Sequence, residues 1–69
     1  MKRTAVKSSN IKAVGYDSTS RTLEVEFTSN SLYQYIGVEP EVASEFLEAK
    51  SVGSYFARNI KNDYEYKKL

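Results

Sequence analysis

The hydrophobic and polar positions divide the chain into a first part with the two-residue period of strands and a second part with helical spacing. Residues 22–28 alternate most regularly, and their apolar members are Leu23, Val25 and Phe27. Such alternation is typical of a strand that buries one face. Shorter apolar stretches at 11–16 and 32–38 indicate two more strands, so the first half predicts a three-stranded antiparallel meander.

Two helices are predicted after the strands. Pro40 suits the first position of a helix, and the apolar residues that follow at helical spacing are Val42, Ala43, Phe46 and Leu47. Ser51 is a candidate N-cap of the second helix, whose apolar stripe comprises Val52, Phe56, Ile60 and Tyr64. The predicted class is therefore α+β, with both helices packed on one face of the sheet.

The second helix is expected to continue almost to the end of the chain. Two pairs of opposite charges four residues apart would then lie on it: Lys61 with Glu65, and Asp63 with Lys67. Gly53 is costly inside a helix, so it indicates either a close approach of another segment or a later helix start.

Strand register decides the face on which Tyr33 and Tyr35 lie. A three-residue loop at 29–31 would place Phe27 opposite Tyr33 and Val25 opposite Tyr35, on the apolar face, whereas a shift by one residue would bury Gln34. Asn30 in that loop suits a left-handed conformation.

A five-residue loop at 17–21 would set Ile11 opposite Phe27 and Ala13 opposite Val25, with Lys12 beside Glu26. The predicted core then comprises Ile11, Leu23, Val25, Phe27, Tyr33, Tyr35, Phe46, Leu47, Phe56, Ile60 and Tyr64. The other sheet face would carry Glu24 and Glu26 in its centre and would be partly apolar through Val14, Tyr16, Leu32 and Ile36.

Composition narrows the chemistry that a chain of 69 residues can perform. It contains neither cysteine nor histidine, which excludes disulfides, thiol nucleophiles, imidazole catalysis and Cys/His zinc sites. The three glycines are far apart, so there is no glycine-rich phosphate loop. We therefore expect a single domain, no enzyme, no metal and no cofactor, and the chain has no apolar run long enough to span a membrane.

The net charge of +1 conceals an uneven distribution. Residues 1–12 contain only basic charges, residues 13–48 are mostly acidic, and residues 49–69 are mostly basic. If the two basic ends are adjacent in space, they could contact phosphates. The candidate nucleic-acid-binding residues are Lys7, Lys12, Tyr55, Arg58 and Lys61, with residues 1–7 expected to form a flexible basic arm.

Several short motifs, taken in order, resemble the KTSC domain family. Ser8-Ser9-Asn10-Ile11 and Val14-Gly15-Tyr16-Asp17 resemble its opening, Tyr33-x-Tyr35 resembles its central YxY motif, and residues 49–56 are similar to its A-x-S-x-G-x-Y-F segment. The resemblance covers residues 7–64 approximately. Asn30 stands where the family usually has glycine, and Val38-Glu39-Pro40 where it usually has Val-Pro.

The resemblance implies a fold more directly than an activity. Such domains occur at the C-terminus of some lysyl-tRNA synthetases and as stand-alone bacterial and phage proteins, which suggests a cytoplasmic module that binds RNA or tRNA. The alternative is a protein-interaction or self-assembling accessory domain, a monomer or weak dimer, that uses the partly apolar sheet face. The resemblance brings no catalytic residues.

Overall fold

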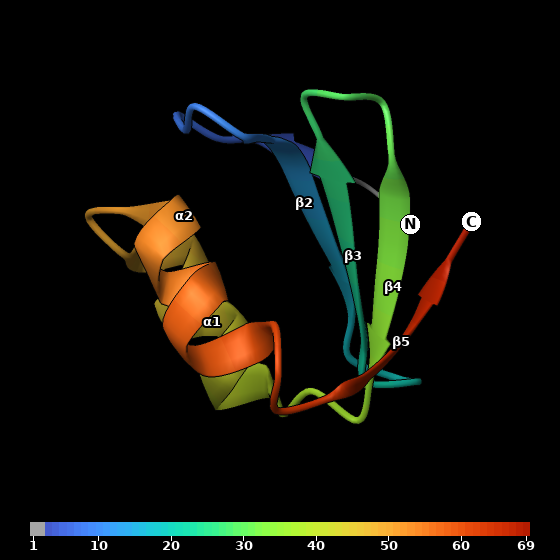
Figure 1. Cartoon of the computed structure of the whole chain (residues 1–69). Helices are drawn as coiled ribbons and strands as arrows, with labels where there is room; N and C mark the ends of the chain where they lie inside the picture. The colour runs from blue at the N-terminus through green and yellow to red at the C-terminus, as the bar shows by residue number, and fades with distance from the viewer. Residues whose placement is uncertain (1–2) are drawn as a thin grey trace.

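The structure, a computed structural model, describes residues 3–69 and contains one antiparallel sheet with helices on one side (Figure 1). Its strands follow in chain order from β1 to β5. The elements are β1 (Arg3–Ala5), β2 (Ile11–Asp17), β3 (Thr22–Phe27), β4 (Leu32–Ile36), α1 (Pro40–Glu48), α2 (Val52–Tyr55), the π-helix η1 (Phe56–Ile60) and β5 (Glu65–Lys68). The α+β class is confirmed, but the sheet has five strands and not the predicted three.

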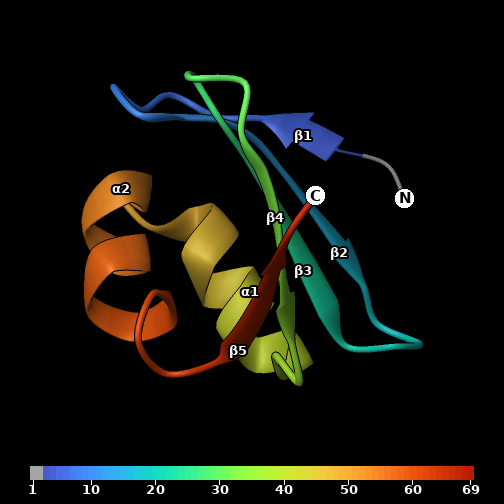
Figure 2. The same ribbon diagram turned by 45° about the vertical axis from the view of Figure 1, so that its right-hand side comes forward.

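The two additional strands are short and form the edges of the sheet, as Figure 2 shows. β1 pairs with β2 and takes residues 3–5 out of the predicted flexible arm, while residues 1–2 of that arm lie outside the described residues. β5 pairs with β4 and replaces the last turns of the predicted helix. The helical pairs predicted for Lys61 with Glu65 and for Asp63 with Lys67 were therefore wrong. The open edge of β4 offers backbone hydrogen bonds that a helix over these residues would leave unused.

The hairpin between β3 and β4 keeps the predicted loop length but begins one residue earlier. Phe27 donates its N–H to the Ser31 carbonyl at 2.9 Å, so the loop is 28–30, with Asn30 in the left-handed conformation at φ 71°. This is the position of the left-handed residue in a three-residue hairpin loop. Val25 consequently faces Tyr33 and Leu23 faces Tyr35. The predicted partners were wrong by two residues, but the predicted face was right.

A β-bulge changes the first hairpin more seriously. Ile11 lies opposite Phe27 as predicted, but the register then shifts, and Val25 faces Val14 instead of Ala13. Lys12 still lies beside Glu26 as predicted, with Nζ 3.9 Å from Oε2, but beyond the bulge Val14 turns into the core and is only 1% exposed. Tyr16 also packs against the core and donates its hydroxyl to the Val38 carbonyl. The placement of Val14 and Tyr16 on the outer face was wrong, because a bulge exchanges the faces of the residues beyond it.

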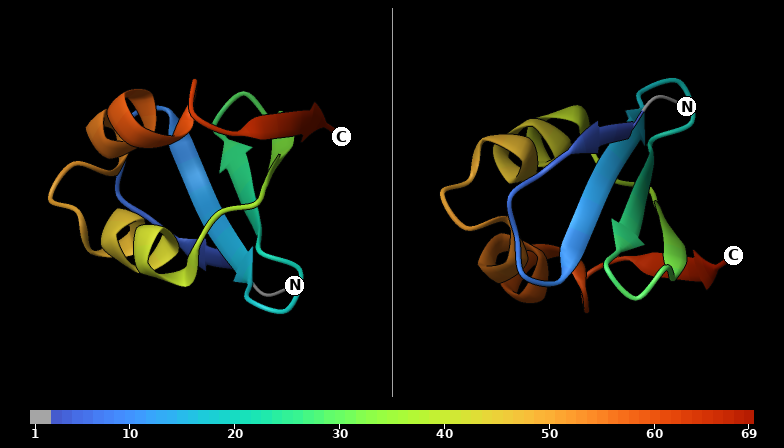
Figure 3. Two further views of the ribbon diagram at one scale, coloured as in Figure 1. Left: turned by 90° about the horizontal axis from the view of Figure 1, so that it is seen from below. Right: turned by 90° about the horizontal axis from the view of Figure 1, so that it is seen from above.

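The core lies between the sheet and the helices, which lie to the left of the sheet in both views of Figure 3. Of the predicted core residues, those buried are Ile11, Leu23, Val25, Tyr35, Phe46, Phe56 and Ile60, and those partly buried against them are Phe27, Tyr33 and Tyr64. Leu47 was wrongly predicted and is 40% exposed. α1 faces the sheet through Ala43 and Phe46, and Leu47 lies about 100° further round the helix than Phe46.

Local signals in the helical segment are confirmed. Pro40 begins α1, and Ser51 caps α2 by accepting the Ser54 N–H. Gly53 marks a close approach: a Cβ there would lie 3.1 Å from Asn10 Oδ1 and 3.2 Å from Ser8 Oγ. The loop between β1 and β2 therefore packs directly on α2, as the right-hand view of Figure 3 also shows. Among the helices of residues 3–69, none has the length and apolarity needed to cross a membrane.

Candidate nucleic-acid interface

Five aromatic rings from four different elements gather where η1 faces the outer part of the sheet. Phe56 of η1 meets Phe27 edge-on at 5.4 Å between ring centroids and Tyr35 edge-on at 5.5 Å. Tyr66 of β5 lies 5.5 Å from Tyr33 and 5.6 Å from Tyr35. The strand pairing explains the gathering, because Tyr35 and Tyr66 are direct cross-strand partners and share one face of the sheet.

These rings line a groove of about 490 Å³, which we call the aromatic groove. Its polar rim comprises Asn10, Lys61, Asn62 and the hydroxyl residues 28, 29 and 31 of the β3–β4 loop. Tyr35 and Phe56 form the base of the groove and are about 4% and 5% exposed, whereas Tyr66 is 57% exposed. The groove therefore combines a fixed apolar floor with one ring that remains largely accessible to a ligand.

The phenol of Tyr35, in the floor of the groove, is neutral over the physiological pH range. Burial, and after it the neighbouring Tyr33 and Tyr66, raise the pKa of Tyr35 to about 12. A neutral phenol can donate a hydrogen bond and can stack, but it supplies neither a base nor a nucleophile at neutral pH. The arrangement suits recognition of a flat ligand through its faces and edges.

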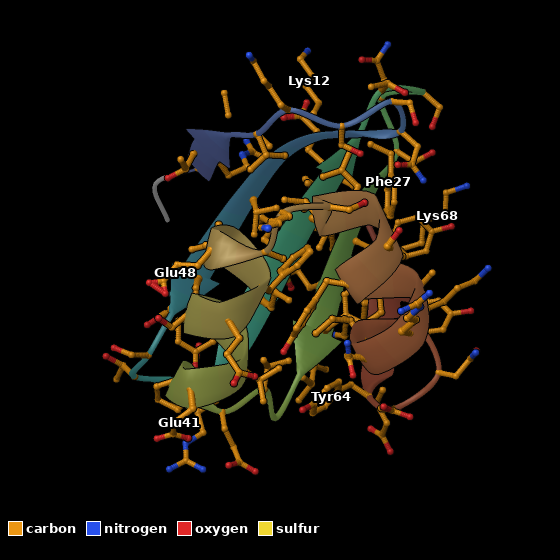
Figure 4. The ribbon with its side chains drawn as sticks, turned by 90° about the vertical axis from the view of Figure 1, so that its left-hand side faces the viewer. Lys12, Phe27, Glu41, Glu48, Tyr64 and Lys68 are labelled. Carbon is orange, nitrogen blue, oxygen red and sulfur yellow. The ribbon has the colours of Figure 1, made fainter. Side chains whose placement is uncertain are left out.

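The charges around the groove favour an anion. Among residues 3–69, no Asp or Glu side chain lines the groove, and Lys61 is part of its rim. Lys68 is paired with Tyr33 across β4 and β5, so it extends from the same sheet face. Figure 4 shows Lys68 beside Phe27 on the η1 side, whereas Glu41 and Glu48 of the acidic helix α1 lie on the opposite side. Lys68 thus lies on the side of the molecule away from the acidic helix α1.

The structure places the five predicted binding residues at different sites. Lys61 lines the aromatic groove, and Lys7 lines a second cavity described below. Lys12 pairs with Glu26. Tyr55 donates its hydroxyl to Glu45 Oε1 at 3.1 Å, and burial together with this carboxylate raises the pKa of its phenol. Arg58 is exposed on η1 but lines neither cavity.

Sequence reasoning missed the contribution of β5 to this groove. Tyr66 and Lys68 were assigned to a helix, although Tyr64 and Tyr66 alternate with charged residues in the way expected of a strand. Tyr33 and Tyr35 were recognised as a pair on the helix-facing side of the sheet, and there they form a wall and the floor of the groove.

The outer sheet face is less apolar than predicted, because Val14 and Tyr16 pack on the core side of the sheet. Glu24, only 8% exposed, accepts from Arg3 at 2.9 Å and from the Gln34 amide at 3.1 Å. The negative charge of Glu24 is therefore paired with Arg3 on the sheet itself. In residues 3–69 no group of three or more acidic side chains is placed to hold a metal ion.

Comparison with known proteins agrees with this fold. The chain matches the KTSC domain over residues 7–64. It is 46% identical over 67 residues to an uncharacterized protein of Stutzerimonas stutzeri, covering 96% of this chain and 94% of that protein. The crystal structure of a KTSC domain protein from Yersinia pestis superimposes with a TM-score of 0.96 at 37% identity, covering 99% of this chain and 96% of that one.

A second group of relatives is much longer. Over 59 residues the chain is 42% identical to a lysine–tRNA ligase of Nostoc, which covers 86% of this chain but only 10% of the ligase. A lysine–tRNA ligase of Trichormus variabilis matches over the same share of its length. The chain belongs to the KTSC domain family, which confirms the resemblance seen in the sequence.

Proposed function

We propose that this chain is a non-catalytic module that binds single-stranded RNA in the aromatic groove. The observation that carries the proposal is the exposed ring of Tyr66, placed beside Tyr33 and Tyr35 in a groove whose described lining residues include Lys61 and no carboxylate. Proteins that bind single strands combine aromatic stacking surfaces with nearby positive charge. The occurrence of a similar segment in lysine–tRNA ligases agrees with an RNA partner.

A single strand fits this groove better than a duplex for a physical reason. An aromatic side chain can stack on a base only when that base is not already covered by its neighbours in a helix. Stacking contributes about 1–3 kcal/mol per base, whereas each phosphate contact adds a term that weakens with salt. The nearly neutral total charge predicts modest affinity that depends on both contributions.

The test compares variants that keep or remove one contribution at a time, with an oligouridine as the probe. Tyr66→Ala should weaken binding about 5- to 150-fold, the equivalent of losing one stacked base, while Tyr66→Phe should bind nearly as the parent chain does. Lys61→Gln should lower the slope of log affinity against log salt by about 0.7. Lys67→Gln, a change of the same kind on the other sheet face of β5, is the matched control.

Circular dichroism of each variant checks that the fold is retained. The proposal is abandoned if the parent chain binds no single-stranded RNA at low salt. It is also abandoned if Tyr66→Ala binds RNA as tightly as the parent chain. Equal affinity would mean that no base stacks on Tyr66 and that the RNA binds outside the aromatic groove.

A further inference from the structure

A second cavity, of about 370 Å³, lies where the β1–β2 loop meets the start of α2, and we call it the polar cavity. It is lined by residues 7–10, residues 50–54 and Ala57. Lys7 and Lys50 supply two ammonium groups, and four serines supply hydroxyls. Among residues 3–69, neither an acidic nor an aromatic side chain contributes to this lining, so its chemistry differs from that of the aromatic groove.

The loop side of the polar cavity is held in place by specific contacts. The Ser8 hydroxyl donates to Asn10 Oδ1 at 2.9 Å and accepts from the Ile11 N–H at 3.3 Å. Gly53 lets the loop come so close that a Cβ would lie about 3 Å from both polar side chains. The side-chain oxygen Oδ1 of Asn10 already accepts a hydrogen bond from Ser8. The side-chain nitrogen Nδ2 of Asn10 is therefore the group that can donate to a ligand.

Asn10 lines both the polar cavity and the aromatic groove, so the two lie next to each other at that residue. One side of Asn10 offers rings on which bases stack, and the other offers ammonium groups, hydroxyls and an amide. The two chemistries match the two parts of a nucleotide chain, because bases stack on aromatic rings and phosphates accept from Lys, Ser and Asn donors.

We infer that the polar cavity binds the phosphate backbone of the same RNA strand whose bases occupy the aromatic groove, with Lys7 and Lys50 as the charged contacts and Asn10 at the crossing point. This inference rests on the proposed function and extends it: binding depends on strand length. A dinucleotide can fill only the aromatic groove, whereas an octanucleotide can reach both sites and contact both lysines.

The experiment measures the affinity of a dinucleotide and an octanucleotide of uridine by NMR titration at two salt concentrations. The test variant is the double change Lys7→Gln and Lys50→Gln. The matched control is Arg21→Gln with Lys67→Gln, which removes the same charge from residues that line neither cavity.

Each phosphate contact to a single strand contributes a salt slope of about 0.7. The test variant removes two such contacts and therefore lowers the salt slope for the octanucleotide by about 1.4. When the salt concentration is reduced fourfold, the resulting gain in octanucleotide affinity should be about sevenfold smaller in the test variant than in the parent chain. The dinucleotide should be affected by less than about twofold, and so should the octanucleotide in the control variant. The amide signals of residues 8–10 should shift with the octanucleotide more than with the dinucleotide.

The inference is overturned, while the proposed function stands, if the test and control variants lose octanucleotide affinity equally or if the dinucleotide is weakened as much as the octanucleotide. Failure of the parent chain to bind either probe overturns both and is recognised without any variant.

Discussion

The β-bulge at Lys12 can be tested by the same substitution at two positions, Val14→Asp and Ile36→Asp. Simple alternation places both residues on the outer face of the sheet. The structure separates them, because Val14 is 1% exposed in the core while Ile36 is 43% exposed on β4. Equal changes should therefore have very unequal effects on the free energy of unfolding.

The expected magnitudes follow from burial. Removing the Val14 side chain from the core forfeits about 1.5–3 kcal/mol, and an unpaired buried carboxylate adds several more. A chain of this length has a total stability of about 3–10 kcal/mol, so Val14→Asp should leave it largely unfolded. Ile36→Asp should cost about 1–2 kcal/mol, part of it from repulsion by Glu65 directly opposite.

Urea denaturation followed by circular dichroism measures both changes. Val14→Thr provides a variant that stays folded and should lose about 1–3 kcal/mol for its buried hydroxyl. If Val14→Asp proves as stable as Ile36→Asp, and Val14→Thr costs nothing, then Val14 faces solvent and β2 has no bulge at Lys12.

Two further predictions concern the ring cluster. Phe56→Ala should lower the free energy of unfolding by about 3–5 kcal/mol, because Phe56 is buried and contacts the rings of Phe27 and Tyr35. Urea denaturation measures this loss, and Phe56→Leu, the control, should lose much less stability. An equal loss of stability in both variants would contradict the packing of this ring. The pKa of Tyr35, raised to about 12, means that the folded chain holds this proton more tightly than the unfolded chain, whose phenols titrate near about 10. The contribution of this group to stability should be full below about pH 10 and should be lost as the pH rises toward 12. Tyrosinate absorbance should show a phenol that titrates at about pH 12 and that Tyr35→Phe lacks, and a Tyr35→Phe titration identical in shape to that of the parent chain would refute the burial.

The candidate site was predictable only in part. The alternation of residues 22–28 with Tyr33 and Tyr35 was sufficient to place both tyrosines on the helix-facing side of the sheet. Lys61 was singled out by its charge alone. Tyr66 was missed, because the helical spacing of the preceding residues was extended past the point where the chain turns back to β4.

The sequence by itself determined the features that depend on neighbouring residues. Among these are the start of α1 at Pro40, the cap at Ser51 and the left-handed loop residue Asn30. Each arises from the backbone or side-chain chemistry of one residue type in its local setting.

Only the tertiary structure decided the bulge, the two edge strands and the meeting of the two cavities at Asn10. These features depend on which distant backbone groups remain unpaired and on which side chains can be buried together. The four residues of β5, Glu65–Lys68, could by their local sequence either continue the helix or pair with a sheet edge. Between these outcomes, the open edge of β4 and the rings of Tyr33 and Tyr35 favoured the strand that carries Tyr66 into the groove.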